Sequence, residues 1–224
     1  MNRGPTFIFD FDSTLVAAEA LDELAEIALA GEARRDAHLA RIREITAMGM
    51  DGRMSLEQSL SERLAMLSMR PEMLPPLVER LADRFAPSIW QGRQRLSAMA
   101  DRVWVVSGGF HEWVEPVIER LGLRTGNVIA NRLRLATDGS LELDPAASPC
   151  AVDSGKATAI QAAGLGRPRI MVGDGMTDWR VRELGACERF VCFTEVVHRA
   201  PVAARADVVA ANLDAVLGVA GAAG

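Results

Sequence analysis

Four aspartates follow the ends of two short apolar runs and could together hold a metal ion. Asp10 and Asp12 come directly after the first run, and Asp174 and Asp178 follow a later one. Carboxylates gathered in one crevice repel each other unless a cation lies among them. Oxygen ligands suit a hard ion, and Mg²⁺ typically takes one or two carboxylates together with water and a phosphate oxygen. The pattern therefore predicts a Mg²⁺ site.

Two further segments offer donors for a small anion such as phosphate. Ser107, Gly108 and Gly109 lie between an apolar run and a helical pattern, so their hydroxyl and backbone N–H groups can cradle phosphate oxygens. Lys156 begins another helical pattern and is the only lysine among 25 basic residues. A compact ammonium can approach a small anion where a guanidinium does not fit, although a surviving surface lysine is an equal alternative for Lys156 taken alone.

These groups together predict transfer of a phosphoryl group. Mg²⁺, Ser107 and Lys156 would neutralise a phosphate, which otherwise shields itself from nucleophiles. Asp10 can then attack phosphorus and form an aspartyl phosphate. Asp12 can protonate the leaving alcohol and later take a proton from water. Each piece alone has a simpler interpretation as a turn, a loop or a calcium loop. Their order, with each one at the end of a predicted strand, favours catalysis.

The elements that position these residues alternate between strands and helices. Such alternation, with glycine-rich turns between the elements, predicts an α/β fold with a doubly wound parallel sheet. In such a sheet ligands bind beyond the carboxyl ends of the strands. The expected strands are Thr6 to Phe9, Arg102 to Val106, Arg169 to Val172, Phe190 to Phe193 and Val208 to Val209. The expected helices are Phe110 to Leu121, Gly155 to Ala163 and Thr177 to Leu184, and a β-hairpin is expected over Leu133 to Leu143.

One segment interrupts this alternation. Residues 17–85 are helical in pattern throughout, and Ser55 followed by Gln58 is typical of a helix start. We therefore expect a catalytic core made of residues 1–16 and 86–224, with an α-helical cap inserted over residues 17–85.

Composition narrows the class of partner. The net charge of −5 gives no basic field for nucleic acid, and no apolar run reaches the roughly 18 residues of a membrane span. The first residues do not resemble a signal peptide, and the three cysteines lack a zinc-like spacing. We expect a cytoplasmic protein that acts on a small molecule and binds neither nucleic acid nor membrane.

The four motifs resemble those of the haloacid dehalogenase superfamily of phosphatases. The matching segments are Phe9-Asp10-Phe11-Asp12-Ser13-Thr14, Ser107-Gly108-Gly109, Lys156 and Gly173-Asp174-Gly175-Met176-Thr177-Asp178. The resemblance implies that Asp10 is the nucleophile and Asp12 the general acid and base. It also implies that Asp10, the backbone carbonyl of Asp12 and Asp174 bind the metal, with Asp178 supporting its water shell. Lys156 is then a functional residue.

Almost the whole chain further resembles the phosphoserine phosphatases. The similar segments include Glu19 with Leu21 to Ala25, Ile45 to Gly52, Glu57 to Leu64 and Asn127 to Leu133. The resemblance implies that Glu19 binds the substrate ammonium, Arg63 grips its carboxylate and Met50 forms an apolar wall. The chain departs from many relatives at Leu56, where they have Phe, and at Thr177, where some have Asn.

The expected activity is Mg²⁺-dependent hydrolysis of O-phospho-L-serine in serine biosynthesis. A phosphatase or phosphotransferase for another small phosphomonoester, such as phosphoethanolamine or homoserine phosphate, is the nearest alternative. A phospho-accepting signalling module is a more distant one, because such modules lack an acid two residues after the nucleophile and have no helical cap.

Overall fold

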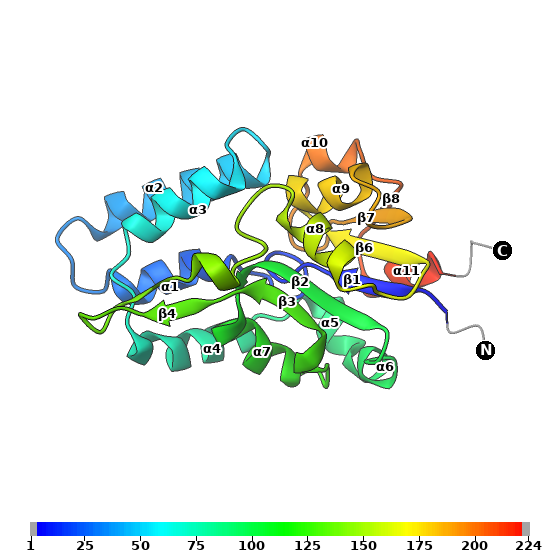
Figure 1. Ribbon diagram of the computed structural model, residues 1–224, viewed down its shortest axis with the longest axis horizontal. Coiled ribbons are helices and arrows are strands. Elements are labelled where there is room, and N and C mark those ends of the chain that lie inside the picture. The colour runs from blue at the N-terminus through cyan, green and yellow to red at the C-terminus, as the bar shows by residue number, and fades with distance from the viewer. Residues whose placement is uncertain (1–3, 221–224) are drawn as a thin grey trace.

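A parallel β-sheet forms the centre of the molecule (Figure 1). The computed structural model describes residues 4–220, and within that range the sheet has six strands in the order β3-β2-β1-β6-β7-β8. All of its neighbouring strands pair in parallel. The strands are β1 (Thr6–Phe9), β2 (Val103–Phe110), β3 (Val128–Asn131), β6 (Arg169–Gly173), β7 (Arg189–Phe193) and β8 (Val208–Ala210). Strand order reverses between β1 and β6, which is where doubly wound sheets bind ligands.

Helices cover both faces of this sheet. One face carries α5 (Pro87–Gln91), α6 (Arg93–Ala98), α7 (His111–Glu119) and α11 (Leu213–Gly218). The other face carries α8 (Gly155–Ala162), α9 (Met176–Glu183) and α10 (Ala200–Ala203). Short 3₁₀ turns lie at Pro71–Met73, Thr125–Asn127 and Pro145–Ala147. The predicted α/β class and doubly wound parallel sheet are confirmed.

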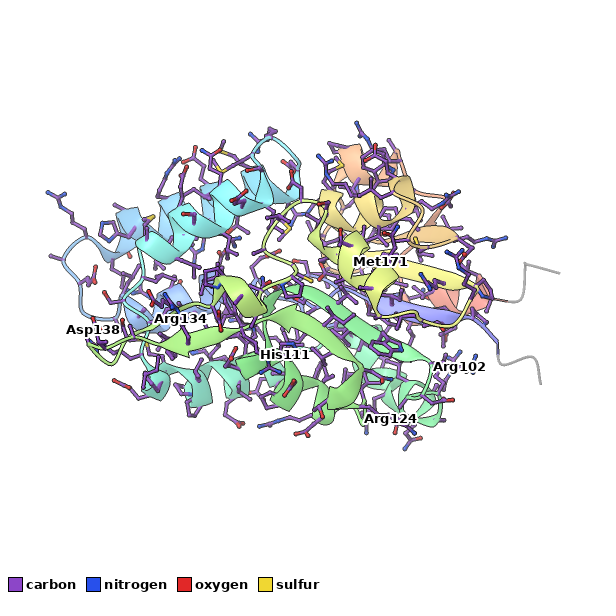
Figure 2. The ribbon with its side chains drawn as sticks, in the orientation of Figure 1. Arg102, His111, Arg124, Arg134, Asp138 and Met171 are labelled. Atoms are coloured by element: carbon purple, nitrogen blue, oxygen red, sulfur yellow. The ribbon has the colours of Figure 1, made fainter. Side chains whose placement is uncertain are left out.

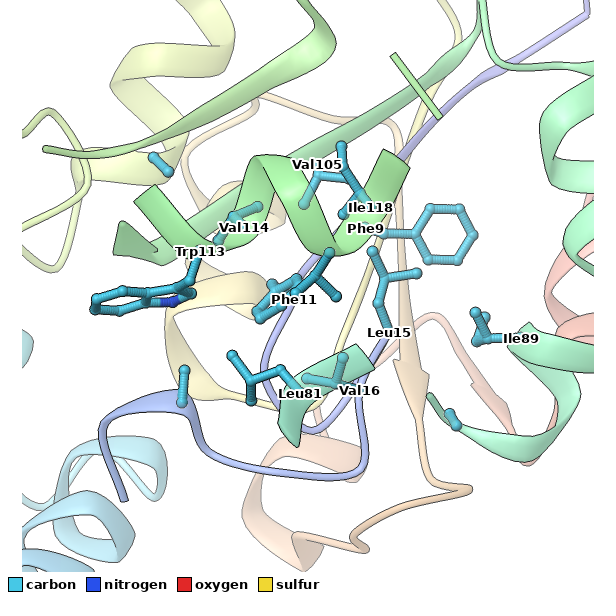
Figure 3. Close-up of a cluster of buried hydrophobic side chains, with 14 of the residues drawn as sticks. Phe9, Phe11, Leu15, Val16, Leu81, Ile89, Val105, Trp113, Val114 and Ile118 are labelled. Atoms are coloured by element: carbon cyan, nitrogen blue, oxygen red, sulfur yellow. The ribbon is translucent and has the colours of Figure 1, made fainter. Parts of the chain in front are cut away.

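Alternation along β1 divides the hydrophobic core into two layers. Phe7 and Phe9 belong to the larger cluster, whereas Ile8 between them belongs to the cluster under α8 and α9. This is the period-2 pattern of a strand that is buried on both faces. Figure 3 shows the larger cluster closing around Phe11 and Leu15, just beyond the end of β1. The backbone that delivers Asp10 and Asp12 is therefore packed on both sides.

The segment between β1 and α5 is helical. It contains α1 (Ala20–Ala28), α2 (Arg35–Met50), α3 (Leu56–Ala65) and α4 (Leu74–Ala82). Helices α2 and α3 lie together, apart from the sheet (Figure 1). Helices α1 and α4 instead place Leu24 and Leu81 in the same hydrophobic cluster as Phe11. Figure 3 shows Leu81 beside Phe11. The division into a core and a cap over residues 17–85 remains a prediction, and residues 1–3 and 221–224 lie outside the described range.

Local signals explain two of the predicted features. Ser55 is the N-cap of α3, and its side chain accepts a hydrogen bond from the backbone N–H of Gln58 at 3.2 Å. The hairpin pairs β4 (Leu133–Leu135) with β5 (Leu141–Leu143), as expected. It extends away from the sheet to its tip at Asp138 (Figure 2). A cleft of about 800 Å³ separates this hairpin from α3.

Two expectations about strands need correction. The second strand does not end at Val106, because β2 continues through Ser107, Gly108 and Gly109 to Phe110. Its pairing with β3 is irregular between Val106 and Phe110, so the glycines occupy a distorted strand end rather than a separate turn. Strand β3 was not predicted as a strand, because its four residues give too short a pattern to separate from a loop.

Among residues 4–220, no helix is both long and apolar enough to cross a membrane.

Candidate active site

The ammonium of Lys156 lies between two carboxylates where β1 and β6 end. Its Nζ atom is 2.7 Å from Oδ1 of Asp10 and 2.7 Å from Oδ1 of Asp178, and all three side chains are buried. The backbone N–H of Phe11 also donates to Oδ1 of Asp10 at 2.7 Å. These bonds fix the rotation of the Asp10 carboxylate. Two attractive neighbours also raise the pKa of Lys156 despite its burial, so it stays charged.

Backbone geometry explains why these residues converge. Asp178 accepts the backbone N–H of Gly175 on Oδ2 at 3.0 Å, which caps the start of α9. A Cβ atom at Gly155 would lie only 2.3 Å from the carbonyl oxygen of Pro149. Glycine therefore lets α8 begin against that loop, and Lys156 follows directly. Sequence reasoning placed Asp178 near the metal but did not foresee that it also anchors Lys156.

Three buried carboxylates form a group with the geometry of a cation site. Oxygen atoms of Asp10, Asp174 and Asp178 lie within 4.8 Å of one another. Burial raises the pKa of Asp10 well above its usual range, and the charge of Asp178 raises it further. Burial likewise raises the pKa of Asp174 to about 6. Such crowding is unfavourable unless positive charge is supplied, and hard oxygen donors fit a hard divalent cation.

A narrow cavity adjoins this group and reaches into the helical segment. Its volume is about 30 Å³. Its walls are Asp10, Asp12, Leu21, Met50, Leu56, Arg63, Gly108, Gly109, Lys156 and Thr177. The structure thus brings Met50 and Arg63 to the same cavity as the two acids of the first motif. The two departures from the resemblance, Leu56 and Thr177, also lie in this wall.

The guanidinium of Arg63 is oriented by hydrogen bonds to its own helix, α3, and to α2. Its Nε donates to the carbonyl of Ser59 at 3.1 Å, and Nη1 donates to the hydroxyl of Thr46 at 3.3 Å. That hydroxyl donates in turn to Oδ1 of Asp22 at 2.8 Å. A guanidinium has five N–H groups, so these two bonds orient it and leave others for a ligand. Burial lowers the pKa of Arg63, and the charges of Glu19, Asp22 and Asp12 oppose that change.

Comparison with known proteins decides the family. Residues 7–181 match the haloacid dehalogenase-like hydrolases. The chain belongs to that family. It is 33% identical to the chloroplastic phosphoserine phosphatase of Arabidopsis thaliana over 89% of its own length and 66% of the relative. It is 32% identical to the phosphoserine phosphatase of Homo sapiens over 76% of its own length and 73% of the relative.

A solved structure supports the same relationship. A phosphoserine phosphohydrolase-like protein from Francisella tularensis matches with a TM-score of 0.84 and 28% identity, covering 96% of this chain and 99% of that one. The predicted membership of the haloacid dehalogenase superfamily is confirmed.

Asp12 lies between the end of β1 and the start of α1. Its Oδ1 accepts the backbone N–H of Ala20 at 2.8 Å, at the start of α1. Burial raises the pKa of Asp12 to about 6, although the bond from Ala20 and the charge of Arg63 lower it. A carboxyl group that titrates near neutral pH is suited to give and take protons.

Four predicted site residues do not line the cavity, namely Glu19, Ser107, Asp174 and Asp178. Asp174 and Asp178 belong to the carboxylate group beside it. Glu19 accepts the hydroxyl of Ser13 on Oε1 at 2.8 Å, and the same oxygen is 3.4 Å from Nη2 of Arg199. Burial raises the pKa of Glu19 to about 8, and the charges of Asp12 and Asp174 add to the rise. Ser107 is fully buried, and its Oγ accepts the backbone N–H of Gly109 at 2.9 Å. Its neighbours Gly108 and Gly109 form the wall instead.

Arg199 is a site residue that sequence reasoning missed. Its Nε donates to Oδ2 of Asp174 at 3.0 Å, and Nη1 lies 3.8 Å from Oδ1 of Asp51 at the end of α2. Arg199 therefore contacts three acids from separate segments, namely Asp174, Asp51 and Glu19. No spacing in the sequence marks Arg199, and Thr194 to Arg199 are not among the segments on which the resemblance rests. Its position between β7 and α10 is the one available signal, because that segment lies beyond the carboxyl end of a parallel strand.

The balance of charge in the site favours a divalent cation. Within the described residues, acids outnumber cations around the site. Arg63 faces the charges of Asp12, Glu19 and Asp22. Arg199 faces those of Glu19, Asp51 and Asp174. A bound divalent ion would offset part of this excess of negative charge.

Proposed function

We propose that this protein is a Mg²⁺-dependent phosphatase that hydrolyses O-phospho-L-serine to L-serine and phosphate. The observation that carries the proposal is the convergence of Asp10, Asp12 and Lys156 with Arg63 and Met50 around one cavity. The first three can transfer a phosphoryl group, and the last two can recognise the rest of a small phosphorylated amino acid. Similarity to phosphoserine phosphatases supports the same substrate.

The carboxylates fit Mg²⁺ by donor type, burial and charge. We expect Asp10, Asp174 and the backbone carbonyl of Asp12 to hold it, with Asp178 supporting its water shell. When bound, Mg²⁺ would withdraw charge from the phosphate oxygens and lower the barrier to attack by an anion. Lys156 would add a second positive charge at 2.7 Å from the Asp10 carboxylate. It therefore favours the ionised form of Asp10, against the burial that raises the pKa of Asp10, and helps to bring two anions together.

Protons and bonds balance over two steps. In the first, a carboxylate oxygen of Asp10 bonds to phosphorus, the bond from phosphorus to the serine oxygen breaks, and Asp12 gives its proton to that oxygen. In the second, water bonds to phosphorus, the bond to Asp10 breaks, and Asp12 takes the proton back. The hydroxyl of Ser107 and the N–H groups beside it would hold the phosphate oxygens through both steps.

Recognition of serine would come from the helical segment. Arg63 can bind the α-carboxylate with its unused N–H groups, and Met50 can cover the short apolar stem. The carboxylate of Glu19 is partly buried and accepts the hydroxyl of Ser13 at 2.8 Å, close to the point where Asp12 bonds to the start of α1. We expect it to attract the ammonium. A substrate that lacks the carboxylate would lose the bonds to Arg63.

The step would yield free serine, so we expect the enzyme to act in serine biosynthesis. We also expect it to be cytoplasmic. The free thiols of the buried Cys150, Cys187 and Cys192 are in keeping with a reducing compartment.

A substrate panel tests the proposal. Phosphate release is measured with Mg²⁺ for O-phospho-L-serine, phosphoethanolamine and O-phospho-L-homoserine. We expect kcat/KM to be highest for O-phospho-L-serine by at least about tenfold, the loss for one charge-assisted hydrogen-bonded contact. Equal values for phosphoethanolamine would contradict the role of Arg63 and favour another phosphomonoester. An added alcohol that becomes phosphorylated would indicate a phosphotransferase, and a stable phosphoprotein without phosphate release would indicate a signalling module.

A further inference from the structure

The peptide bond between Gly108 and Gly109 is held on both of its polar atoms. The N–H of Gly109 donates to Oγ of Ser107 at 2.9 Å, and the carbonyl of Gly108 accepts Nδ2 of Asn131 at 2.8 Å. In a trans peptide these two atoms point in opposite directions. Two glycines allow such a peptide to rotate at little cost, so bonds on opposite sides are what fix its plane.

This orientation determines what Ser107 can offer a ligand. Its Oγ already accepts the N–H of Gly109, and a hydroxyl has a single hydrogen to donate. That hydrogen stays available for a phosphate oxygen. If the Gly108–Gly109 peptide turned over, a carbonyl would replace the N–H beside Ser107 and would compete for the hydroxyl hydrogen.

Asn131 makes a second hydrogen bond, to the loop that precedes α8 and Lys156. Its Oδ1 accepts the backbone N–H of Cys150 at 2.9 Å. The backbone of Pro149 and Cys150 packs directly against Gly155, where a Cβ atom would approach to 2.3 Å. Lys156 follows Gly155 at the start of α8. One side chain therefore joins the strand end that carries Ser107 to the loop before α8, the helix that carries Lys156.

The position of Asn131 requires a side chain that both donates and accepts, which an amide does. Asn131 is 0% exposed, and it must donate to a carbonyl on one side while accepting an N–H on the other. A carboxylate could not donate, and a shorter hydroxyl would not span both bonds. An aliphatic side chain would leave a buried carbonyl and a buried N–H unpaired, at a substantial cost.

We infer that Asn131 is a positioning residue for phosphate binding, which acts through Gly108 and Cys150 to hold Ser107 and Lys156 in register. The inference rests on the phosphate chemistry of the proposed function. It concerns the phosphate group alone and not the serine part of the substrate.

Asn127 provides a matched control at the other end of β3. Its Nδ2 donates to the carbonyls of Ala100 and Val103 at 2.9 and 3.1 Å. It therefore also makes two hydrogen bonds to backbone atoms, but those atoms lie at the end of the sheet opposite the site. Replacing Asn127 by alanine also removes two hydrogen bonds to backbone atoms, but it leaves the bonds of Gly108 and Cys150 unchanged.

The experiment compares Asn131→Ala with Asn127→Ala. Binding of inorganic phosphate with Mg²⁺ present is measured by calorimetry, kcat and KM are measured with p-nitrophenyl phosphate, and Tm is measured for each variant. We expect both variants to lower Tm. Only Asn131→Ala should weaken phosphate binding, by about tenfold or more, and lower kcat to a similar extent, because two positioned donors are lost from the phosphate site. Phosphate binding within twofold of the wild type, or an equal loss in Asn127→Ala, would overturn the inference.

Asn131→Asp tests the same idea with an isosteric side chain, and it decides the question if Asn131→Ala does not fold. The ionised carboxylate can accept from Cys150 but cannot donate to Gly108, whereas its protonated form can do both. Phosphate affinity relative to the wild type should therefore improve as the pH is lowered. A constant ratio at every pH would contradict the role of the Gly108 bond. The substrate panel can fail without affecting these measurements, because neither probe contains serine.

Discussion

At the carboxyl ends of β1 and β6, each reactive side chain is held by partners from separate elements, whereas Arg63 on α3 is held from within the helical segment. Lys156 is fixed by Asp10 from β1 and by Asp178 from α9, at 2.7 Å each. Arg63 is fixed by Ser59 of its own helix and by Thr46 of α2. We call these two regions the sheet side and the helical side of the cavity.

Within the described residues, few polar contacts join α2 and α3 to the sheet side, although Glu19 and Ala20 at the start of α1 bond to Ser13, Arg199 and Asp12. The backbone N–H of Leu56 donates to Oδ1 of Asp153 at 2.8 Å, and Arg199 lies 3.8 Å from Asp51. Under the proposed function, the chemical step and the choice of substrate depend on separate sets of bonds. Substitutions on the sheet side should therefore lower kcat for every phosphate ester. Substitutions on the helical side should change KM for particular ones.

Asp10→Asn should cause the largest loss. The amide keeps the shape of the side chain but is a far weaker nucleophile, so we expect turnover to fall by at least about a thousandfold for all substrates. Phosphate release is the measurement, and circular dichroism shows whether the fold is kept. The exposed Asp36 on α2 offers a control as Asp36→Asn. Substantial activity in Asp10→Asn would rule out Asp10 as the nucleophile.

Lys156→Arg should come next. The charge is kept, but a planar guanidinium cannot reproduce a compact ammonium placed 2.7 Å from each of two buried carboxylates. We expect kcat to fall by about a hundredfold, the usual loss when one preorganised donor is removed from a reacting site. The loss should be similar for O-phospho-L-serine and p-nitrophenyl phosphate. A wild-type rate would mean that the single lysine of the chain has no catalytic importance.

Arg63→Ala should affect only the helical side. We expect KM for O-phospho-L-serine to rise by about 10- to 100-fold, because hydrogen bonds to a charged group are lost. KM for p-nitrophenyl phosphate, which has no carboxylate, should change little. Arg41→Ala, an exposed arginine on α2, serves as the control. An equal loss for both substrates would show that the two sides are not separable.

The sequence predicted the sheet side more completely than the helical side. Asp10, Asp12, Lys156 and Asp174 could be found because they directly follow buried strands or begin helices, and strand ends meet at one edge of a parallel sheet. The same reasoning gave β1, β6 and β7 nearly to the residue. It failed for the end of β2, because Ser107-Gly108-Gly109 resembles a turn. The strand nevertheless continues through these residues, and its pairing with β3 resumes only at Phe110.

Contacts between distant segments could not be predicted in this way. Arg199 reaches Asp174 from a loop whose path depends on how β7 and β8 pack, and no periodic pattern encodes that path. Asn131 was visible as part of a similar stretch, but its two bonds to Gly108 and Cys150 depend on three segments meeting. The contacts of such residues depend on tertiary structure, so their roles cannot be recognised until the segments are placed together.

Glu19 lies where the two sides meet, and it should give the smallest and most specific effect. Burial raises its pKa from 4.5 to about 8, so between these pH values the folded, metal-free protein binds more protons than the unfolded chain. Stability from this group is complete below pH 4.5 and is lost as the pH rises through about 8. Glu19→Gln cannot ionise, so it should be increasingly stabilised relative to the wild type across that window. Thermal denaturation with a chelator present measures this difference, with the exposed Glu57→Gln alongside. A difference in Tm that does not grow with pH would mean that Arg199 and Ser13 fully compensate the negative charge of Glu19. The helical side would then be held to the sheet side more tightly than its few contacts suggest.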